Sequence, residues 1–136
     1  MGSYFMDDLL NFKKTLRQLK AFVSTPVAND RDRAGVIQAF EYTFEKCWKA
    51  LPKRAGKEGI EIASPKKAFS FAFQNSWIPK DKEKLWLKML EDRNLTSHTY
   101  KEDVAKEVLR KIVAEYVPGF EALLLKLDTP DRFNLK

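Results

Sequence analysis

Apolar residues recur every three or four positions along most of the chain, which is the spacing of one face of an α-helix. The first stripe, from residue 5 to residue 23, consists of Phe5, Leu9, Phe12, Leu16, Leu19 and Val23. Breaks at Thr25-Pro26 and Asn29-Asp30 end it. A second helix is predicted from about residue 30 to residue 54, with a buried stripe of Val36, Ile37, Phe40, Phe44, Cys47, Trp48 and Leu51. Pro52 lies in its last turn, where it predicts a kink or an earlier end.

The remaining half of the chain continues the same period. Ser64-Pro65 offers an N-cap residue and a proline suited to the first helical position, and Phe69, Phe73 and Trp77 are expected on one face of the helix that follows. A fourth helix after Pro79 carries Leu85, Trp86, Met89 and Leu90. A fifth buries Val104, Val108, Ile112 and Tyr116 and is expected to end at Pro118-Gly119, before a short sixth with Phe120, Leu123, Leu124 and Leu127.

No segment alternates with the two-residue period of a strand, so the predicted fold class is all-α. The short connections favour an antiparallel up-down bundle of four main helices plus short extra helices. The 136 residues suit a single domain spanning 1–136. Within it, residues 1–5 are expected to be foreign to the natural chain or disordered, and residues 128–136 to form a frayed tail.

The composition indicates in which cellular compartment the protein works and which kinds of metal or cofactor site it could hold. No apolar run is long enough to cross a membrane, and no signal segment opens the chain. Cys47 is the single cysteine, which fits a reducing compartment, and we expect a cytoplasmic protein with Cys47 packed in the core. One histidine and one cysteine cannot supply a structural zinc site. We therefore predict no metal and no cofactor.

The net charge of +6 permits an anionic partner without requiring one. Between residues 46 and 67, seven basic residues face two acidic ones, which leaves a local balance of +5. The candidates there for binding RNA or phosphate are Lys49, Lys53, Arg54, Lys66 and Lys67. The alternative is that this stretch is a solvated face.

Residues 93–100 combine Arg93, Asn94, Tyr100 and His98, the only histidine of the chain. Histidine titrates near neutral pH when unperturbed, and arginine is a natural partner for phosphate. On one continuous helix Arg93 and His98 would lie about 140° apart. Thr99 and Glu102 have capping-box spacing, however, so the fourth helix is expected to stop before Thr99. The motif would then cross a helix corner, with the phosphate-attracting N-terminus of the fifth helix beside His98 and Tyr100.

Such a corner suits metal-independent RNA cleavage, in which a 2′-hydroxyl attacks the adjacent phosphorus. His98 would take or give the proton, and Arg93 would stabilise the charge that builds on phosphorus. Asn94, one turn before His98, is a candidate to orient it or to contact phosphate. One histidine per chain cannot be both base and acid, so we predict a composite site across a homodimer. The alternative is structural: a packed or solvated histidine, and a surface ion network at Glu91, Asp92 and Arg93.

Three motifs resemble one protein family. Residues 32–49 (DRAGVIQAFEYTFEKCWK), residues 64–66 (SPK) and residues 90–100 (LEDRNLTSHTY) resemble the nucleotidyltransferase substrate-binding proteins, a branch of the HEPN superfamily. The last segment has the R-x-x-x-x-H-x-Y pattern of HepT-type toxins, carried here by Arg93, His98 and Tyr100. The resemblance extends from the first helix to about Tyr116.

The resemblance implies a HEPN-like helical bundle that dimerises, with Arg93 and His98 facing a cleft between protomers. It also implies a cognate minimal nucleotidyltransferase as partner, with RNA as substrate. In a HepT/MntA-type toxin–antitoxin pair this chain would be the RNase, and the partner would silence it by attaching AMP to Tyr100. The alternative within the family is a non-catalytic substrate-binding subunit of a two-component nucleotidyltransferase.

Two acidic residues of the second helix leave a question open. Glu41 and Glu45 lie one turn apart, and one of them would hold Arg93 in place if the motif is functional. Otherwise both are surface carboxylates paired with Lys46 or Lys49, an interpretation we favour for Glu45 and leave open for Glu41. The chain lacks the paired carboxylates and the Gly-Ser loop of a nucleotidyltransferase, so ATP would be the partner's substrate.

Overall fold

The structure of the protein, a computed structural model, describes residues 2–54, 64–98 and 101–129, without the side chains of residues 2–5, 53 and 98. Its elements are α1 (Gly2–Val23), α2 (Asp30–Arg54), α3 (Pro65–Gln74), the 3₁₀ turn η1 (Lys80–Lys82), α4 (Glu83–His98), α5 (Glu102–Lys111), the π-helical turn η2 (Ile112–Tyr116) and α6 (Val117–Asp128). These ranges contain helices and turns and no strand, so the predicted all-α bundle is confirmed.

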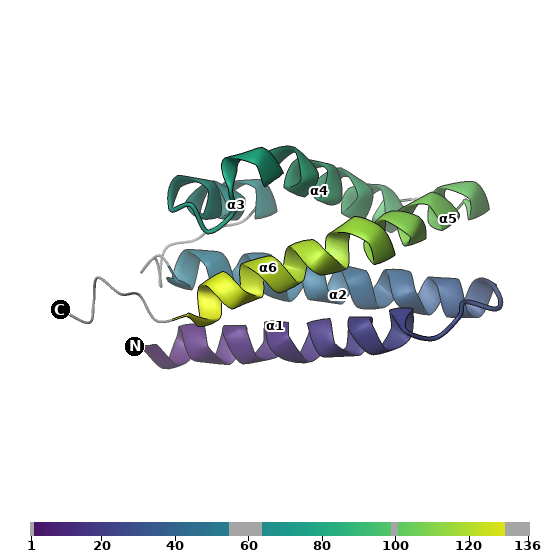
Figure 1. Cartoon of the computed structure of the whole chain (residues 1–136), viewed down its shortest axis with the longest axis horizontal. Coiled ribbons are helices and arrows are strands. Elements are labelled where there is room, and N and C mark those ends of the chain that lie inside the picture. The colour runs from purple at the N-terminus through teal and green to yellow at the C-terminus, as the bar shows by residue number, and fades with distance from the viewer. Residues whose placement is uncertain (1, 55–63, 99–100, 130–136) are drawn as a thin grey trace.

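α1 and α2 form an antiparallel hairpin, as their two apolar stripes predicted (Figure 1). Leu9, Phe12, Leu16 and Leu19 are buried on α1, and the whole predicted stripe of α2 is buried. Asn29 caps α2, because its side-chain oxygen accepts a hydrogen bond of 2.8 Å from the backbone N–H of Asp32. α2 runs through Pro52 to Arg54, so the proline does not end it early.

α3 begins as predicted but ends one turn sooner. Pro65 is its first residue, and the Ser64 hydroxyl accepts a 3.2 Å hydrogen bond from the backbone N–H of Lys67. The helix ends at Gln74, and Ser76 takes a left-handed conformation with a φ of 58°. A left-handed residue just past the last turn is a common way to end a helix. Trp77 therefore lies beyond α3, which corrects its expected place on one helical face with Phe69 and Phe73.

The fourth helix ends before Thr99, as predicted, but the corner follows His98 and does not separate Arg93 from His98. α4 continues through Arg93 to His98, and α5 begins at Glu102 with Lys101 at the N-cap and no side-chain cap. The predicted capping box at Thr99 is therefore wrong, although Thr99 itself lies outside the described residues. The first turn of α5 carries Glu102 and Asp103, which already complement the positive end of its dipole. A phosphate is not favoured there.

The chain stays helical through Pro118-Gly119, where an end was predicted. α5, η2 and α6 follow one another without a break (Figure 1). The backbone N–H of Val117 bonds to the carbonyl of Ile112, five residues back, and Pro118 stands in the first turn of α6. Pro118 has no N–H to place, and the wider π turn before it leaves room for its ring.

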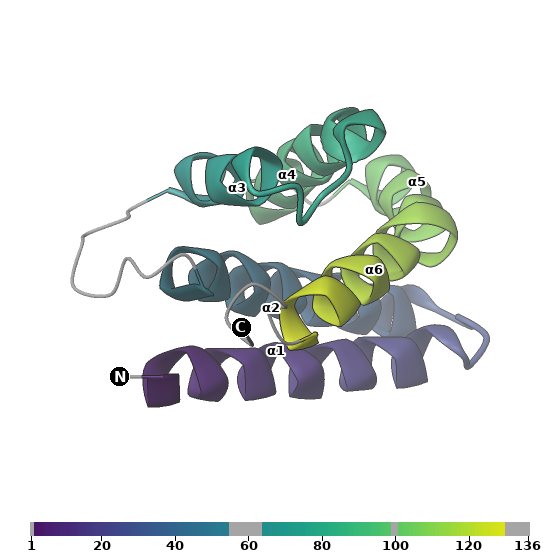
Figure 2. The ribbon, with the colours of Figure 1, turned by 60° about the vertical axis from the view of Figure 1, so that its left-hand side comes forward.

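An aromatic core joins the two layers of the bundle, with α3 and α4 over the α1–α2 hairpin and α6 between them (Figure 2). Phe40 of α2 lies at its centre, with ring centroids 5.5 Å from Tyr116, 6.1 Å from Phe120 and 6.2 Å from Phe44. Trp86 of α4 contacts Phe69 and Phe120. Among the described residues, no helix has both the length and the hydropathy to cross a bilayer.

Candidate functional site

Arg93 lies near the C-terminal end of α4, where two hydroxyl side chains connect it to α2. Its Nη1 donates a 2.5 Å hydrogen bond to the hydroxyl of Ser97, one turn later. Ser97 is 3.2 Å from Oε2 of Glu41, and the Thr96 hydroxyl donates to the same oxygen at 2.7 Å. Glu41 therefore reaches Arg93 through Ser97. This arrangement favours a holding role for Glu41 over a simple surface carboxylate.

Glu45, one turn further along α2, behaves differently. Its carboxylate accepts a 2.8 Å hydrogen bond from the indole N–H of Trp48 and pairs with Lys49 at 3.4 Å. Both partners lie on the same helix, within four residues of Glu45. The expected pairing of Glu45 with a lysine of α2 is confirmed, and Glu45 takes no part in the contacts that hold Arg93.

A shallow groove borders the Glu41 end of this arrangement. It encloses about 500 Å³ between α2 and the C-terminal end of α4. Its lining residues are Arg31, Ala34, Gly35, Ile37, Gln38, Glu41 and Thr96. Apart from its chain neighbours and the backbone of its own helix, no described atom lies within 4 Å of where a Cβ of Gly35 would stand, so this wall is open.

The other motif residues are placed only in part. His98 is the last residue of α4, and Asn94 is exposed on the same helix. The His98 side chain and all of Tyr100 lie outside the described residues. Because α4 is continuous, the positions of Arg93 and His98 lie about 140° apart around it. The motif therefore does not cross a corner between Arg93 and His98, which corrects the expectation that such a corner would let the two residues converge.

The basic candidates lie away from Arg93. Lys49 and Arg54 are on α2 about 12 to 20 Å beyond Glu41, at 1.5 Å per residue. Lys66 and Lys67 are exposed in the first turn of α3, at the end of the bundle opposite the α4–α5 corner (Figure 1). The Lys49 ammonium is paired with Glu45, and the Arg54 guanidinium lies 5.8 Å from the Trp77 ring centroid. Lys53 belongs to α2, with its side chain outside the described part of the structure. The fold does not gather these residues around Arg93.

Asp92 is the residue that sequence reasoning misjudged. The alternative interpretation of the motif placed it in a surface ion network, but it is 3% exposed and accepts a hydrogen bond from the hydroxyl of Tyr116. Its position carried a signal, because it follows the buried Met89 by three residues and so continues the inward stripe of α4. Ser97 and Thr96 were also missed, since a hydroxyl has no sequence signature when its partner is 55 residues away.

The described residues contain no group of three His, Cys, Asp or Glu side chains able to hold a metal ion. Arg93 lies near the C-terminal end of α4, whose helix dipole favours a cation. The site can offer a fixed guanidinium and a titratable residue at a helix end.

Comparison with protein-family models identifies one family. A sequence model described as "Nucleotidyltransferase substrate binding protein like" matches residues 7–129. Among solved structures, a protein of Thermus thermophilus is 36% identical, with a TM-score of 0.76 over 87% of this chain and 99% of that one. A search of curated proteins finds no match.

Proposed function

Because the chain belongs to the nucleotidyltransferase substrate-binding-like family, we propose that it works beside a minimal nucleotidyltransferase as a metal-independent endoribonuclease. The main support is the position of Arg93 on α4, the helix that ends at His98. Arg93 donates a hydrogen bond to Ser97, and Ser97 in turn contacts Glu41 of α2. The protein would be the toxin of a HepT/MntA-type pair. Adenylylation of Tyr100 would silence it by adding bulk and negative charge beside the motif.

The reaction forms a bond between the 2′-oxygen and phosphorus and breaks the bond from phosphorus to the 5′-oxygen. One histidine accepts the 2′-hydroxyl proton, and a second gives a proton to the leaving 5′-oxygen. Arg93 stabilises the added negative charge on the phosphoryl oxygens. Since each chain has one histidine, a homodimer supplies both the base and the acid. The products are a 2′,3′-cyclic phosphate and a 5′-hydroxyl.

The test is cleavage of single-stranded RNA by purified protein in excess chelator, with end-group analysis. We expect cyclic phosphate ends, and Arg93→Ala or His98→Ala should lower the rate by at least about a hundredfold. Arg110→Ala is the matched control, because Arg110 is an exposed arginine paired with Glu107 at 2.7 Å. If the wild type leaves RNA intact, or if all three variants cut equally, the endoribonuclease proposal is wrong.

Control by the partner is tested by incubation with the nucleotidyltransferase and ATP. Intact-mass measurement should show one added adenylate, absent from Tyr100→Phe, together with loss of RNA cleavage.

A second candidate function is a non-catalytic substrate-binding subunit, favoured by the open groove beside Glu41 and by the description of the family. It predicts that the chain enhances transfer by its partner to a third molecule. If Tyr100 is the only acceptor, this second candidate is excluded.

A further inference from the structure

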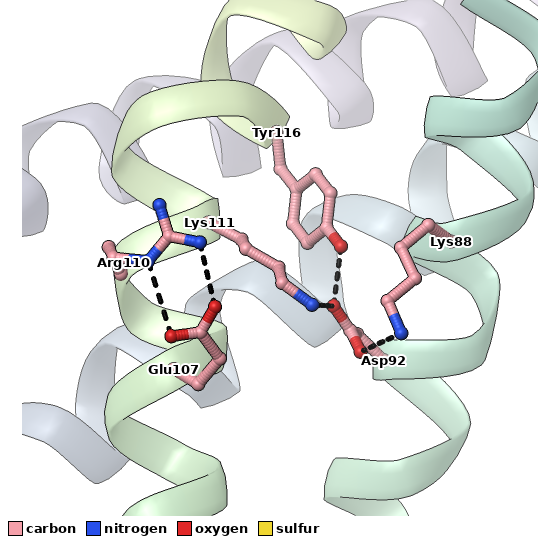
Figure 3. A network of polar contacts seen from close by, with 6 residues as sticks. All are labelled: Lys88, Asp92, Glu107, Arg110, Lys111 and Tyr116. Atoms are coloured by element: carbon pink, nitrogen blue, oxygen red, sulfur yellow. Dashed lines mark hydrogen bonds and ion pairs between the residues drawn. The ribbon is translucent and has the colours of Figure 1, made fainter.

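A polar cluster around the buried Asp92 joins α4 to the junction of α5 and η2 (Figure 3). The Asp92 cluster consists of Asp92 and Lys88 on α4, Lys111 at the end of α5 and Tyr116 in η2. Asp92 Oδ2 accepts a hydrogen bond from the Tyr116 hydroxyl and lies 3.4 Å from Nζ of Lys111. Lys88 is more distant, at 3.9 Å from Oδ1. One carboxylate thus joins α4 to the α5–η2 junction.

A buried carboxylate is costly to keep unless its oxygens are paired. Tyr116 is fully buried, and its burial, together with the hydrogen bond to Asp92, raises its pKa. The hydroxyl therefore stays protonated across the physiological range and remains a donor to Asp92. Loss of this donor would leave the carboxylate with Lys111 as its nearest partner.

The π-helical turn explains how two partners reach the same carboxylate. In an α-helix, Lys111 and Tyr116 would lie about 140° apart around the axis. The hydrogen bond from Val117 to Ile112 spans five residues, so the turn is wider and brings residues five apart towards one side. π-Helical turns inside helices are frequent at functional sites.

The part of α4 that carries the motif is attached by polar contacts. Its buried apolar residues, Trp86 and Met89, lie in its first half. Of residues 91–97, whose side chains the structure describes, only Asp92 is buried. Two sets of polar contacts attach this half: the Asp92 cluster joins it to α5 and η2, and the contacts of Thr96 and Ser97 with Glu41 join it to α2.

We propose that Asp92, Tyr116 and Lys111 are positioning residues, which fix the C-terminal half of α4 and with it Arg93 and His98. This role rests on the proposed ribonuclease function. Asp92 is the direct neighbour of Arg93, so a shift of α4 that breaks the contacts of Asp92 moves Arg93 and Ser97 together away from Glu41 of α2. Positioning errors of about 1 Å can cost a hundredfold in rate.

The first measurement does not depend on activity. In Tyr116→Phe the ring stays in the core while the hydroxyl is lost, and we expect amide exchange in residues 91–98 to rise at least about tenfold relative to α1. The His98 imidazole gives a single signal, because it is the only histidine, and it should shift or broaden. Tyr42→Phe is the matched control, since Tyr42 is 54% exposed and bonds only weakly to Gln38 at 3.3 Å.

The exchange measurement must distinguish a loss of stability of the whole protein from a local loosening of the C-terminal half of α4. Leu16→Ala weakens the core on α1, which packs on α2 and α6, and serves as the reference for global loosening. If exchange in Tyr116→Phe is unchanged, or rises equally in all helices as in Leu16→Ala, the positioning role is overturned.

The second measurement uses RNA cleavage. Tyr116→Phe should lower kcat by about tenfold to a hundredfold and leave KM for RNA within about twofold. If the wild type cuts RNA and Tyr116→Phe cuts at the wild-type rate, the positioning role is wrong although the endoribonuclease proposal stands. If the wild type does not cut RNA, the endoribonuclease proposal fails, and the exchange measurement still tests the attachment of α4.

Two lysine variants keep the test decisive if Tyr116→Phe does not fold. The Lys111 side chain is 17% exposed, whereas that of Lys88 is 50% exposed and further from the carboxylate. Lys111→Met should therefore raise exchange in residues 91–98 and lower kcat, and Lys88→Met should change neither. Equal, wild-type behaviour of both variants would contradict the proposal.

Discussion

At the residue scale, the hydroxyl of Ser97 links the guanidinium of Arg93 to the carboxylate of Glu41. Ser97 and Thr96 both contact Glu41, but only Ser97 also accepts from the Arg93 guanidinium. Ser97→Ala should therefore lower the rate of RNA cleavage about tenfold, equivalent to a hydrogen bond of ~1.4 kcal/mol, and Thr96→Ala should have a smaller effect. Single-turnover rates at saturating RNA measure both. Equal losses would mean that Ser97 acts only through Glu41.

Cys47 is a residue of a reactive type that its buried surroundings make unreactive. It is fully buried, and burial raises the pKa of its thiol well above the usual value. The thiol stays neutral at pH 8, and the thiolate is the reactive form. Labelling by iodoacetamide should be at least about a hundredfold slower in the native protein than in denaturant, because the unfolded fraction is small. Fast labelling of the native protein would place Cys47 at the surface.

At the element scale, the start of α3 depends on one side chain that the sequence already identified. The Ser64 hydroxyl satisfies a backbone N–H that the helix itself cannot. Ser64→Ala should lower the free energy of unfolding by about 1 kcal/mol. Ser70→Ala is the control, because the Ser70 hydroxyl bonds to the carbonyl of Lys67 inside the helix, where alanine is at least as favourable. Urea unfolding followed by circular dichroism compares the two, and equal losses would argue against the cap.

The ends of the helices show which boundaries can be predicted from neighbouring residues in the sequence and which cannot. Ser64-Pro65 and Asn29-Asp30 mark helix starts correctly, because capping involves neighbouring residues. Pro118-Gly119 indicated a helix end that the protein does not use, and the capping-box spacing at Thr99 gave the end of α4 correctly but not the N-cap of α5, which is Lys101. At Pro118 the helix continues because a π turn precedes the proline, and the hydrogen bonding of a π turn cannot be predicted from the period of apolar residues.

At the scale of the whole molecule, Phe40 connects the α1–α2 hairpin to the α5–α6 segment. Its fully buried ring contacts Phe44, Tyr116 and Phe120. Phe40→Ala should lower the free energy of unfolding by about 3–5 kcal/mol. Phe22→Ala, at a position 41% exposed, should cost less than about 1 kcal/mol. Thermal unfolding of both variants checks this, and similar midpoints would mean that Phe40 is not central.

The proposed composite site would need two chains, and we expect a particle of about twice 15.8 kDa by light scattering. Equal amounts of wild type and His98→Ala, unfolded and refolded together, should cut RNA at about a quarter of the rate of wild type alone at the same total protein concentration, because only dimers that hold two histidines are active. A monomeric particle, or a rate of about half, would place the chemistry within one chain.

The sequence by itself determined the helical class, the buried stripes of α1 and α2, the cap of α3 and the family motif. These features depend on residues within one or two turns of each other, so a linear pattern records them. Only the tertiary structure decided that Asp92 is buried, that Glu41 reaches Arg93 and that a π turn joins α5 to α6. The partners in these contacts are 24 residues apart for Asp92 and Tyr116 and 55 for Glu41 and Thr96. Hydrogen bonds over such separations exist only once packing has brought the helices together.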